Sequence, residues 1–168
     1  MINQQRVMGC ALLMGGFMLA ASHAVANEIS GTLDGEPKQW HVITHAEGST
    51  ANFSELMPGM TDVTIQGHRE QTFETQGTLS ISFMVMEGEA SSAMVTYFPE
   101  SSIMPHYGTE DEVPIDIEVL DIDGDEGRAK GRVATSLAYL ASMSDDYDHS
   151  NTMDVGVSFD VTLIREEF

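Results

Sequence analysis

Three carboxylates in one short stretch have the types and the spacing to bind a hard cation. In the stretch 121–127 (Asp-Ile-Asp-Gly-Asp-Glu-Gly), Asp121, Asp123 and Asp125 could converge if the chain curled around calcium, which prefers oxygen ligands. A calcium loop of the EF-hand type ends with Glu at its twelfth position. Here Arg132 holds that position. Two interpretations therefore stand: a weak calcium site formed by these three Asp residues, and an Asp-Gly hairpin turn whose acids face water.

The histidines do not have the spacing of a metal site. Five of them follow residue 26, and they are His41, His45, His68, His106 and His149. His41 and His45 are four residues apart, a spacing that pairs ligands on a helix. This stretch has the pattern of a strand, however, in which four residues span roughly 13 Å. Two side chains so far apart cannot share a zinc ion at about 2 Å each, so we expect a surface feature.

Motifs typical of enzymes are missing. The sequence contains no nucleophile elbow, no Gly-rich phosphate loop and no His-Glu-x-x-His motif. Its single cysteine, Cys10, lies close to the N-terminus. The sequence therefore favours a non-catalytic protein. An enzyme of unknown class is the alternative, because a catalytic site can also be gathered from distant strands.

Aromatic side chains could form a sugar-binding surface. Trp40, the only tryptophan, shares one face of a predicted strand with Val42, and we expect it in the core. Tyr107 and Tyr147 fall in the two longest predicted loops. These two tyrosines are the exposed candidates for carbohydrate recognition.

Methionines recur in two successive predicted strands. Met84 and Met86 alternate with Phe83 and Val85, and Met94 follows in the next strand. Thioether ligands select copper(I), so a copper site is one interpretation. Because flexible methionines also fill irregular gaps in apolar cores, we expect these side chains to fill the space between two sheets.

Strands must position all of these residues. From Val155 to Leu163 every odd position is apolar and every even position is polar or Gly, which puts five apolar groups on one face of a strand. Residues 76–87 alternate in the same way, and Asp34-Gly35 predicts a hairpin. We predict one all-β domain over residues 27–168, an antiparallel β-sandwich or partly closed barrel of about eight strands.

Three local predictions complete this scheme. Residues 46–61 are expected to form a loop with a short strand around Phe53, because they contain small residues and a Pro-Gly pair. Residues 99–114 contain three of the five prolines and are expected to cross one end of the fold irregularly. Gly67 is expected to mark a bulge in a strand.

The first 26 residues have the composition of a secretory signal peptide. A polar start with Arg6 precedes an apolar run of about 15 residues, which is shorter than the roughly 20 that a spanning helix needs. Ala24-Val25-Ala26 forms a small-x-small site, so we expect cleavage after Ala26 and a periplasmic or secreted protein. Cys10 leaves with this segment, and the exported chain then has no disulfide.

Negative charge dominates the predicted exported chain. All 27 acidic residues follow residue 26, whereas one of the seven basic residues is Arg6, which leaves six and a formal charge of −21. Such a surface repels nucleic acid and anionic membranes. It suits divalent cations, cationic partners or a saline habitat. A second acidic run, 145–149, is expected to be a solvated loop.

Two stretches resemble small uncharacterised exported β-proteins of Gram-negative bacteria. They are Ser30-Gly-Thr-Leu-Asp-Gly35 together with Trp40, and Phe159-Asp-Val-Thr-Leu163. The resemblance covers the two ends of the predicted domain. It implies a β-sandwich and transfers no site.

These observations lead to one expected function and two alternatives. We expect an exported, non-catalytic binding or interaction module for a protein or glycan of the cell envelope. The alternatives are a calcium-stabilised carbohydrate-recognition module and an enzyme of unknown class.

Overall fold

A computed structural model describes residues 27–45, 48–90 and 92–166, and the predicted signal peptide lies outside these residues. In the described parts the regular structure is entirely β, as predicted, and no helix there is long and apolar enough to cross a membrane. The strands are β1 (Glu28–Leu33), β2 (Glu36–His41), β3 (Thr44–His45), β4 (Gly48–Ser49), β5 (Ala51–Met57), β6 (Met60–Gly67), β7 (Thr78–Met86), β8 (Ser92–Phe98), β9 (His106–Gly108), β10 (Val113–Asp123), β11 (Glu126–Leu140) and β12 (Asp148–Arg165).

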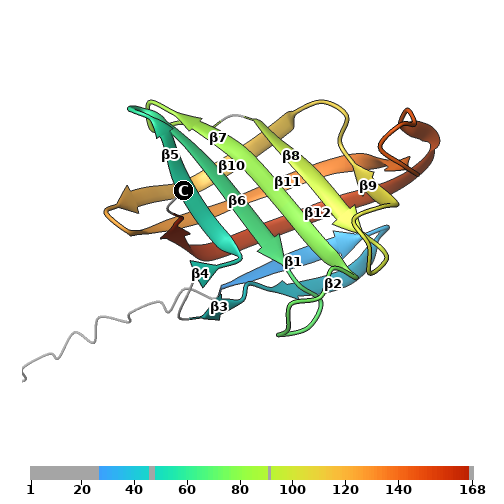
Figure 1. The fold of residues 1–168 in the computed structure, drawn as a ribbon, viewed down its shortest axis with the longest axis horizontal. Coiled ribbons are helices and arrows are strands. Elements are labelled where there is room, and N and C mark those ends of the chain that lie inside the picture. Colours follow the sequence, from blue (N-terminus) through green and yellow to red (C-terminus); the bar gives the residue numbers. More distant parts are fainter. Residues whose placement is uncertain (1–26, 46–47, 91, 167–168) are drawn as a thin grey trace, which may run out of the picture.

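Ten of the described strands form one mixed sheet, and β3 and β4 form a separate pair. Hydrogen-bonded neighbours lead from β11 through β12, β5, β6, β7, β8 and β9 back to β11, which makes a partial ring of seven strands. Strands β5–β8 lie in front of β10–β12 and cross them at an angle (Figure 1). The prediction of about eight antiparallel strands was too low in number, and it missed that β12 pairs with β5 in parallel.

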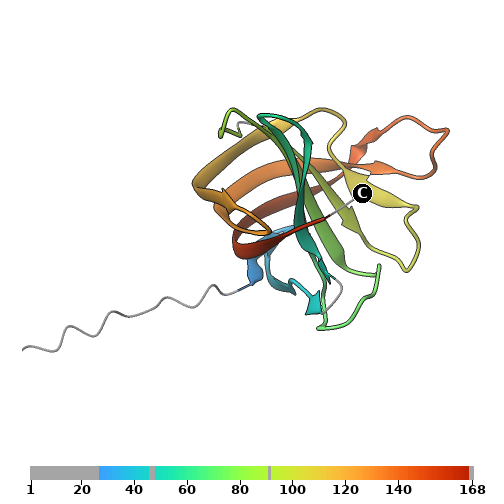
Figure 2. The same cartoon turned by 60° about the vertical axis from the view of Figure 1, so that its left-hand side comes forward.

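The core lies between these two layers, which face each other in the turned view (Figure 2). The alternation in β12 is confirmed, because all five apolar side chains from Val155 to Leu163 are at most 3% exposed. The four alternating side chains of β7 from Leu79 to Val85 are also buried. The first hairpin is confirmed as well, with positive φ at both Asp34 and Gly35.

Of three local predictions, two hold in part and the bulge at Gly67 is wrong. Residues 46–61 contain the full strand β5, because its buried Ala51 and Phe53 pack into the core while β6 supplies its hydrogen bonds. Residues 99–105 and 109–112 are irregular, as expected, but the short strand β9 lies between them and β10 begins at Val113. Gly67 marks no bulge, because β6 and β7 pair in unbroken register up to that residue. A Cβ on Gly67 would lie 2.6 Å from the Cβ of Trp40, so the position needs a residue without a side chain.

The methionines of β7 and β8 do not fill the core. Met84 and Met86 face away from Phe83 and Val85, since adjacent residues of a strand point to opposite faces. Met94 pairs with Ser82 and lies on the same outward face. The prediction that these side chains fill the gap between sheets is therefore wrong.

Strand β11 carries a row of cations on its outward face. Arg128, Lys130 and Arg132 are each paired with a carboxylate of a neighbouring strand. The Arg128 guanidinium donates two hydrogen bonds to the two oxygens of Asp160, at 2.9 and 2.8 Å. These hydrogen bonds hold the pKa of the Asp160 carboxyl below its usual range. These ion pairs join β11 to both of its neighbours, β10 and β12, on a surface that is otherwise acidic.

We expect Asp160→Asn to lower the free energy of unfolding at pH 7 by about 1 kcal/mol. Because the pKa of Asp160 is depressed by folding, its contribution is present above the unfolded value of about 4 and is lost as the pH falls through the folded pKa. The variant should therefore lose stability less steeply than the wild type below about pH 4. Urea unfolding at a series of pH values measures both effects. Asp116→Asn is the matched control, since Asp116 and its partner Arg132 are more than half exposed.

Candidate functional site

The three acidic residues proposed for calcium lie on a β-hairpin. Asp121 and Asp123 are exposed on β10, and the strand turns into β11 at Gly124 and Asp125. Gly124 has φ 64°, as the first central residue of a type II′ turn requires. The Asp125 carboxylate faces Arg165, with Oδ1 3.6 Å from Nε. Within the described ranges no group of three or more His, Cys, Asp or Glu residues could hold a metal ion.

The calcium site at Asp121, Asp123 and Asp125 stays a prediction, and a thermal melt tests it. An ion that binds only the folded state adds about 2.7 kcal/mol at 100 times its dissociation constant. The hypothesis therefore expects millimolar calcium to raise the melting temperature by roughly 5–10 °C over EDTA at matched ionic strength, with no such rise in magnesium. Equal melting temperatures in calcium and EDTA would remove it.

The second acidic run, 145–149, begins in the connection between β11 and β12, which projects from one end of the fold, and its last two residues, Asp148 and His149, are the first of β12 (Figure 2). Asp148 and His149 have partners within the described residues. The pKa of Asp148 is lowered by hydrogen bonds from the hydroxyl and the backbone N–H of Ser150. His149 Nε2 lies 2.9 Å from a carboxylate oxygen of Glu110. Two of the charged groups of this run are thus held by neighbouring side chains.

The predicted positions of the aromatic residues are confirmed only in part. Trp40 is buried, and its indole N–H donates to the carbonyl of Gly77 at 2.9 Å. Tyr107 lies in strand β9 and not in a loop, is half-buried, and donates to Asn151. Tyr147 is also half-buried, and burial followed by the charge of Glu110 raises its pKa. The two tyrosines therefore form no exposed sugar platform.

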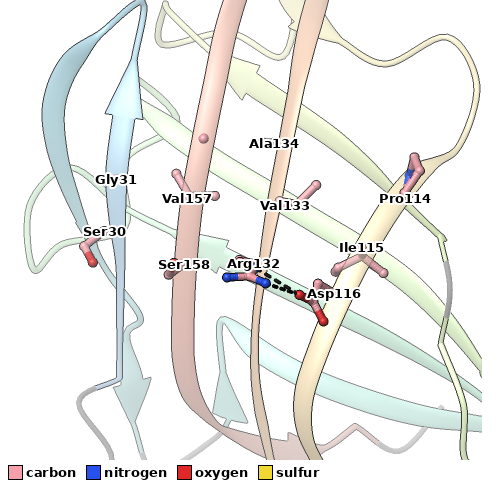
Figure 3. A pocket seen from close by; sticks show the side chains of 11 residues that line it. Ser30, Gly31, Pro114, Ile115, Asp116, Arg132, Val133, Ala134, Val157 and Ser158 are labelled. Carbon is pink, nitrogen blue, oxygen red and sulfur yellow. Dashed lines mark hydrogen bonds and ion pairs between the residues drawn. The ribbon is translucent and has the colours of Figure 1, made fainter.

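A shallow hollow of about 390 Å³ lies on the outward side of β1, β10, β11 and β12 (Figure 3). The hollow forms because Gly156 has no side chain and Ala134, directly opposite it on β11, has only a methyl group. The charged groups at its rim are satisfied, since Arg132 donates twice to Asp116 Oδ2 at 2.9 and 2.6 Å. The hollow thus offers a small-residue surface without a polar group that needs a ligand.

A second hollow, of about 310 Å³, has a different character. It lies where the chain leaves β6, and the loop 69–77 and the segment 99–105 border it. Its lining is Gln66, His68, Phe73, Glu74, Thr75, Thr78, Phe98 and Ile103. We call it the His68 pocket. His68 faces outward from the sheet beside Thr78, yet it is only 5% exposed because the loop covers it.

One nitrogen of His68 has no hydrogen-bond partner in the part of the chain that the structure describes. His68 Nδ1 lies 3.0 Å from the carbonyl oxygen of Glu74 and 3.1 Å from Thr78 Oγ1, whose hydroxyl donates to the same carbonyl at 2.7 Å. A carbonyl only accepts, so we assign the proton to Nδ1, and in this tautomer Nε2 is an acceptor. Nε2 is buried and has no hydrogen-bond partner among the described residues. An unsatisfied buried acceptor costs about 1–3 kcal/mol.

An aromatic side chain contacts the His68 imidazole at the mouth of the pocket. The Phe73 ring lies edge-on to the imidazole with centroids 5.5 Å apart, and it makes a similar contact with His45. Phe73 is 60% exposed and Ile103 66% exposed, so both present apolar surface at the mouth of the pocket. The arrangement joins an apolar mouth to one buried acceptor, and it can take a ring-sized ligand that brings a hydrogen-bond donor.

The chain was also compared with known proteins. It matches no protein-family model, no curated protein and no solved structure. The candidate site therefore stands on its own geometry.

Proposed function

We propose that this chain is an exported, non-catalytic binding module that takes a small ligand in the His68 pocket. In this proposal the leader is removed after Ala26 and one sandwich-type domain acts in the periplasm or outside the cell. The observation that carries it is the buried, unpartnered Nε2 of His68 beside the exposed ring of Phe73. Polar groups left unsatisfied in a native protein are uncommon and call for an explanation. A ligand that donates a hydrogen bond to Nε2 supplies one.

The walls of the pocket define the rest of the ligand. Phe73, Phe98 and Ile103 offer aromatic and aliphatic contacts, and a hollow of about 310 Å³ suits a single ring better than a polymer. We infer an aromatic hydroxyl or amine compound, or a side chain of that kind on a partner.

Phenol and toluene test this proposal as a matched pair. They differ in the hydroxyl that donates to Nε2, and a buried acceptor discriminates against the analogue that cannot donate. We expect phenol to bind about tenfold more tightly than toluene, which corresponds to a hydrogen bond of about 1.4 kcal/mol. Titration with detection of the His68 imidazole nitrogens by NMR measures both affinities. Equal affinities, or no change at His68 at millimolar phenol, would overturn the proposal.

Two substitutions of His68 separate the roles of its nitrogens. The Asn amide N–H in His68→Asn can replace Nδ1–H on the Glu74 carbonyl but leaves nothing at Nε2, so the preference for phenol should disappear. The longer Gln in His68→Gln can place an acceptor oxygen near Nε2, so part of the preference should remain. Met143→Ala is the control for exposed apolar surface, since Met143 is 82% exposed and lies outside the pocket. Fluorescence of Trp40 reports whether the loop 69–77 keeps its conformation in each variant, because the indole N–H donates a hydrogen bond to the carbonyl of Gly77.

A further inference from the structure

Methionines are concentrated on one outward face of the sheet. Eight of the 12 methionines follow residue 26, and five of these lie on the outward side of β5–β8, at positions 57, 60, 84, 86 and 94. Met57 and Met86 are 55% and 56% exposed. Large apolar side chains in water do not stabilise the fold, so core packing does not explain this concentration.

The strand register brings four of them together. Met60 lies directly opposite Met57 on β5 and directly opposite Met86 on β7. Residues directly opposite have Cβ atoms about 4.5–5.5 Å apart. Met84 is two residues from Met86 on the same strand and face. Each methionine has three rotatable bonds and can turn its sulfur toward a common point above Met60. We call these four residues the methionine cluster.

Two tight turns hold the backbone of the cluster. Met57 and Met60 flank Pro58-Gly59, where Pro at the second and Gly at the third position suit a type II turn and Gly59 has φ 81°. The neighbouring turn starts after Met86, with positive φ at Glu87 and Gly88. The Glu87 N–H donates to the Gly59 carbonyl at 2.9 Å, which ties one turn to the other. The side chains are flexible, but their attachment points are fixed.

The surroundings carry negative charge. Strands β5, β6, β7 and β8 contain no Lys or Arg, whereas Glu55, Asp62, Glu87 and Glu89 lie on or beside them. Asp62 lies opposite Met84, and partial burial raises its pKa. Arg165 pairs with Glu55 at 3.9 Å and offsets its charge, so Asp62, Glu87 and Glu89 are the carboxylates that attract a cation above the cluster.

We propose that the methionine cluster binds one copper(I) ion through the thioether sulfurs of Met57, Met60, Met84 and Met86. Soft, uncharged thioethers select Cu(I) over zinc, calcium or magnesium, and the acidic surroundings add attraction for a cation. Met94 stays outside the ligand set, because its sulfur accepts a hydrogen bond from Thr109 at 3.7 Å. The proposal is independent of the His68 pocket, which lies beyond the other end of β6, roughly 25 Å along the strand.

Anaerobic competition tests this proposal. The purified protein is titrated against the Cu(I) complex of bicinchoninate, and we expect it to withdraw one Cu(I) per chain. X-ray absorption at the copper edge should show sulfur ligands only. Failure to withdraw Cu(I), or a first shell of nitrogen or oxygen, would overturn the proposal.

Methionine-to-leucine variants locate the site. Met60→Leu removes the central sulfur and should weaken Cu(I) binding about tenfold or more, with similar losses in Met57→Leu and Met86→Leu. Met94→Leu and Met143→Leu remove sulfurs outside the cluster and should bind as the wild type does. Leucine keeps the volume and apolar character, so the fold and any apolar docking surface are preserved. Wild-type affinity in Met60→Leu with an unchanged melting temperature would show that the cluster is not a copper site.

Discussion

Replacement of Gly31 by Ala should lower the free energy of unfolding by about 3 kcal/mol and the melting temperature by roughly 10 °C. Gly31 lies in β1 directly opposite Val157 of β12. A Cβ on Gly31 would lie 2.7 Å from the Cα of Val157, and the carbonyl oxygen of Gly156 would be closer still. Because these are backbone atoms, no rotamer change relieves the contact, and β1 must move away from β12. Thermal and urea unfolding measure the loss.

Gly156→Ala is the matched control, one register position from Gly31 on the partner strand. There the nearest atoms to a new Cβ are Thr32 Oγ1 at 3.6 Å and Ala134 Cβ at 3.9 Å, which are ordinary contacts. Ala restricts the unfolded chain more than Gly does, so this variant should gain up to about 1 kcal/mol. Equal losses in the two variants would mean that glycine serves strand flexibility and not close approach of two backbones.

Alternation of apolar and polar residues predicts strands well when one face of the strand is buried and the other is exposed to solvent. The strands β7 and β12 show this pattern, and both were found with the predicted side chains in the core. Strand β5 was underestimated because only Ala51 and Phe53 alternate clearly before the exposed end that begins at Glu55. Its identity depends on hydrogen bonds to β6 and β12, which are set by the fold and leave no local pattern.

The sites were harder to predict, because their residues meet across strands. His68 gave no signal in the sequence. Its burial depends on the loop 69–77 folding over it, and its tautomer depends on the carbonyl of Glu74. The methionines were noticed, but their face was assigned wrongly: the alternation put Phe83 and Val85 inward, which already required Met84 and Met86 to point outward. The sequence does not show whether another layer covers the outward face of β7. The arrangement of the two layers shows that this face is exposed to solvent.

Replacement of Phe53 by Ala should cost about 3–5 kcal/mol, the largest effect we expect from a single side chain. Phe53 is 1% exposed and is among the largest fully buried side chains of the described core. Loss of its ring leaves a cavity that neighbouring strands cannot fill without moving. Phe73→Ala is the same chemical change at a side chain that is 60% exposed, and it should cost about 1 kcal/mol or less. Urea unfolding compares the two, and similar losses would contradict the assignment of Phe53 to the core.

Phe53 also lies at the short seam that closes the partial ring. Among the described residues two register pairs join β12 to β5, and one of them is Arg165 with Phe53. The Arg165 guanidinium lies 5.1 Å from the centroid of the Phe53 ring, and the Glu166 N–H donates to the Phe53 carbonyl at 2.8 Å. Loss of the aromatic ring of Phe53 should therefore weaken the short β12–β5 pairing more than the long β6–β7 pairing. In hydrogen exchange of Phe53→Ala, we expect the amide of Glu166 to lose more protection than the amides of β7. An equal loss of protection at all of these amides would mean that β12 and β5 separate only when the whole fold unfolds. In that case the packing of the core, and not the two residue pairs, would keep the ring of strands closed.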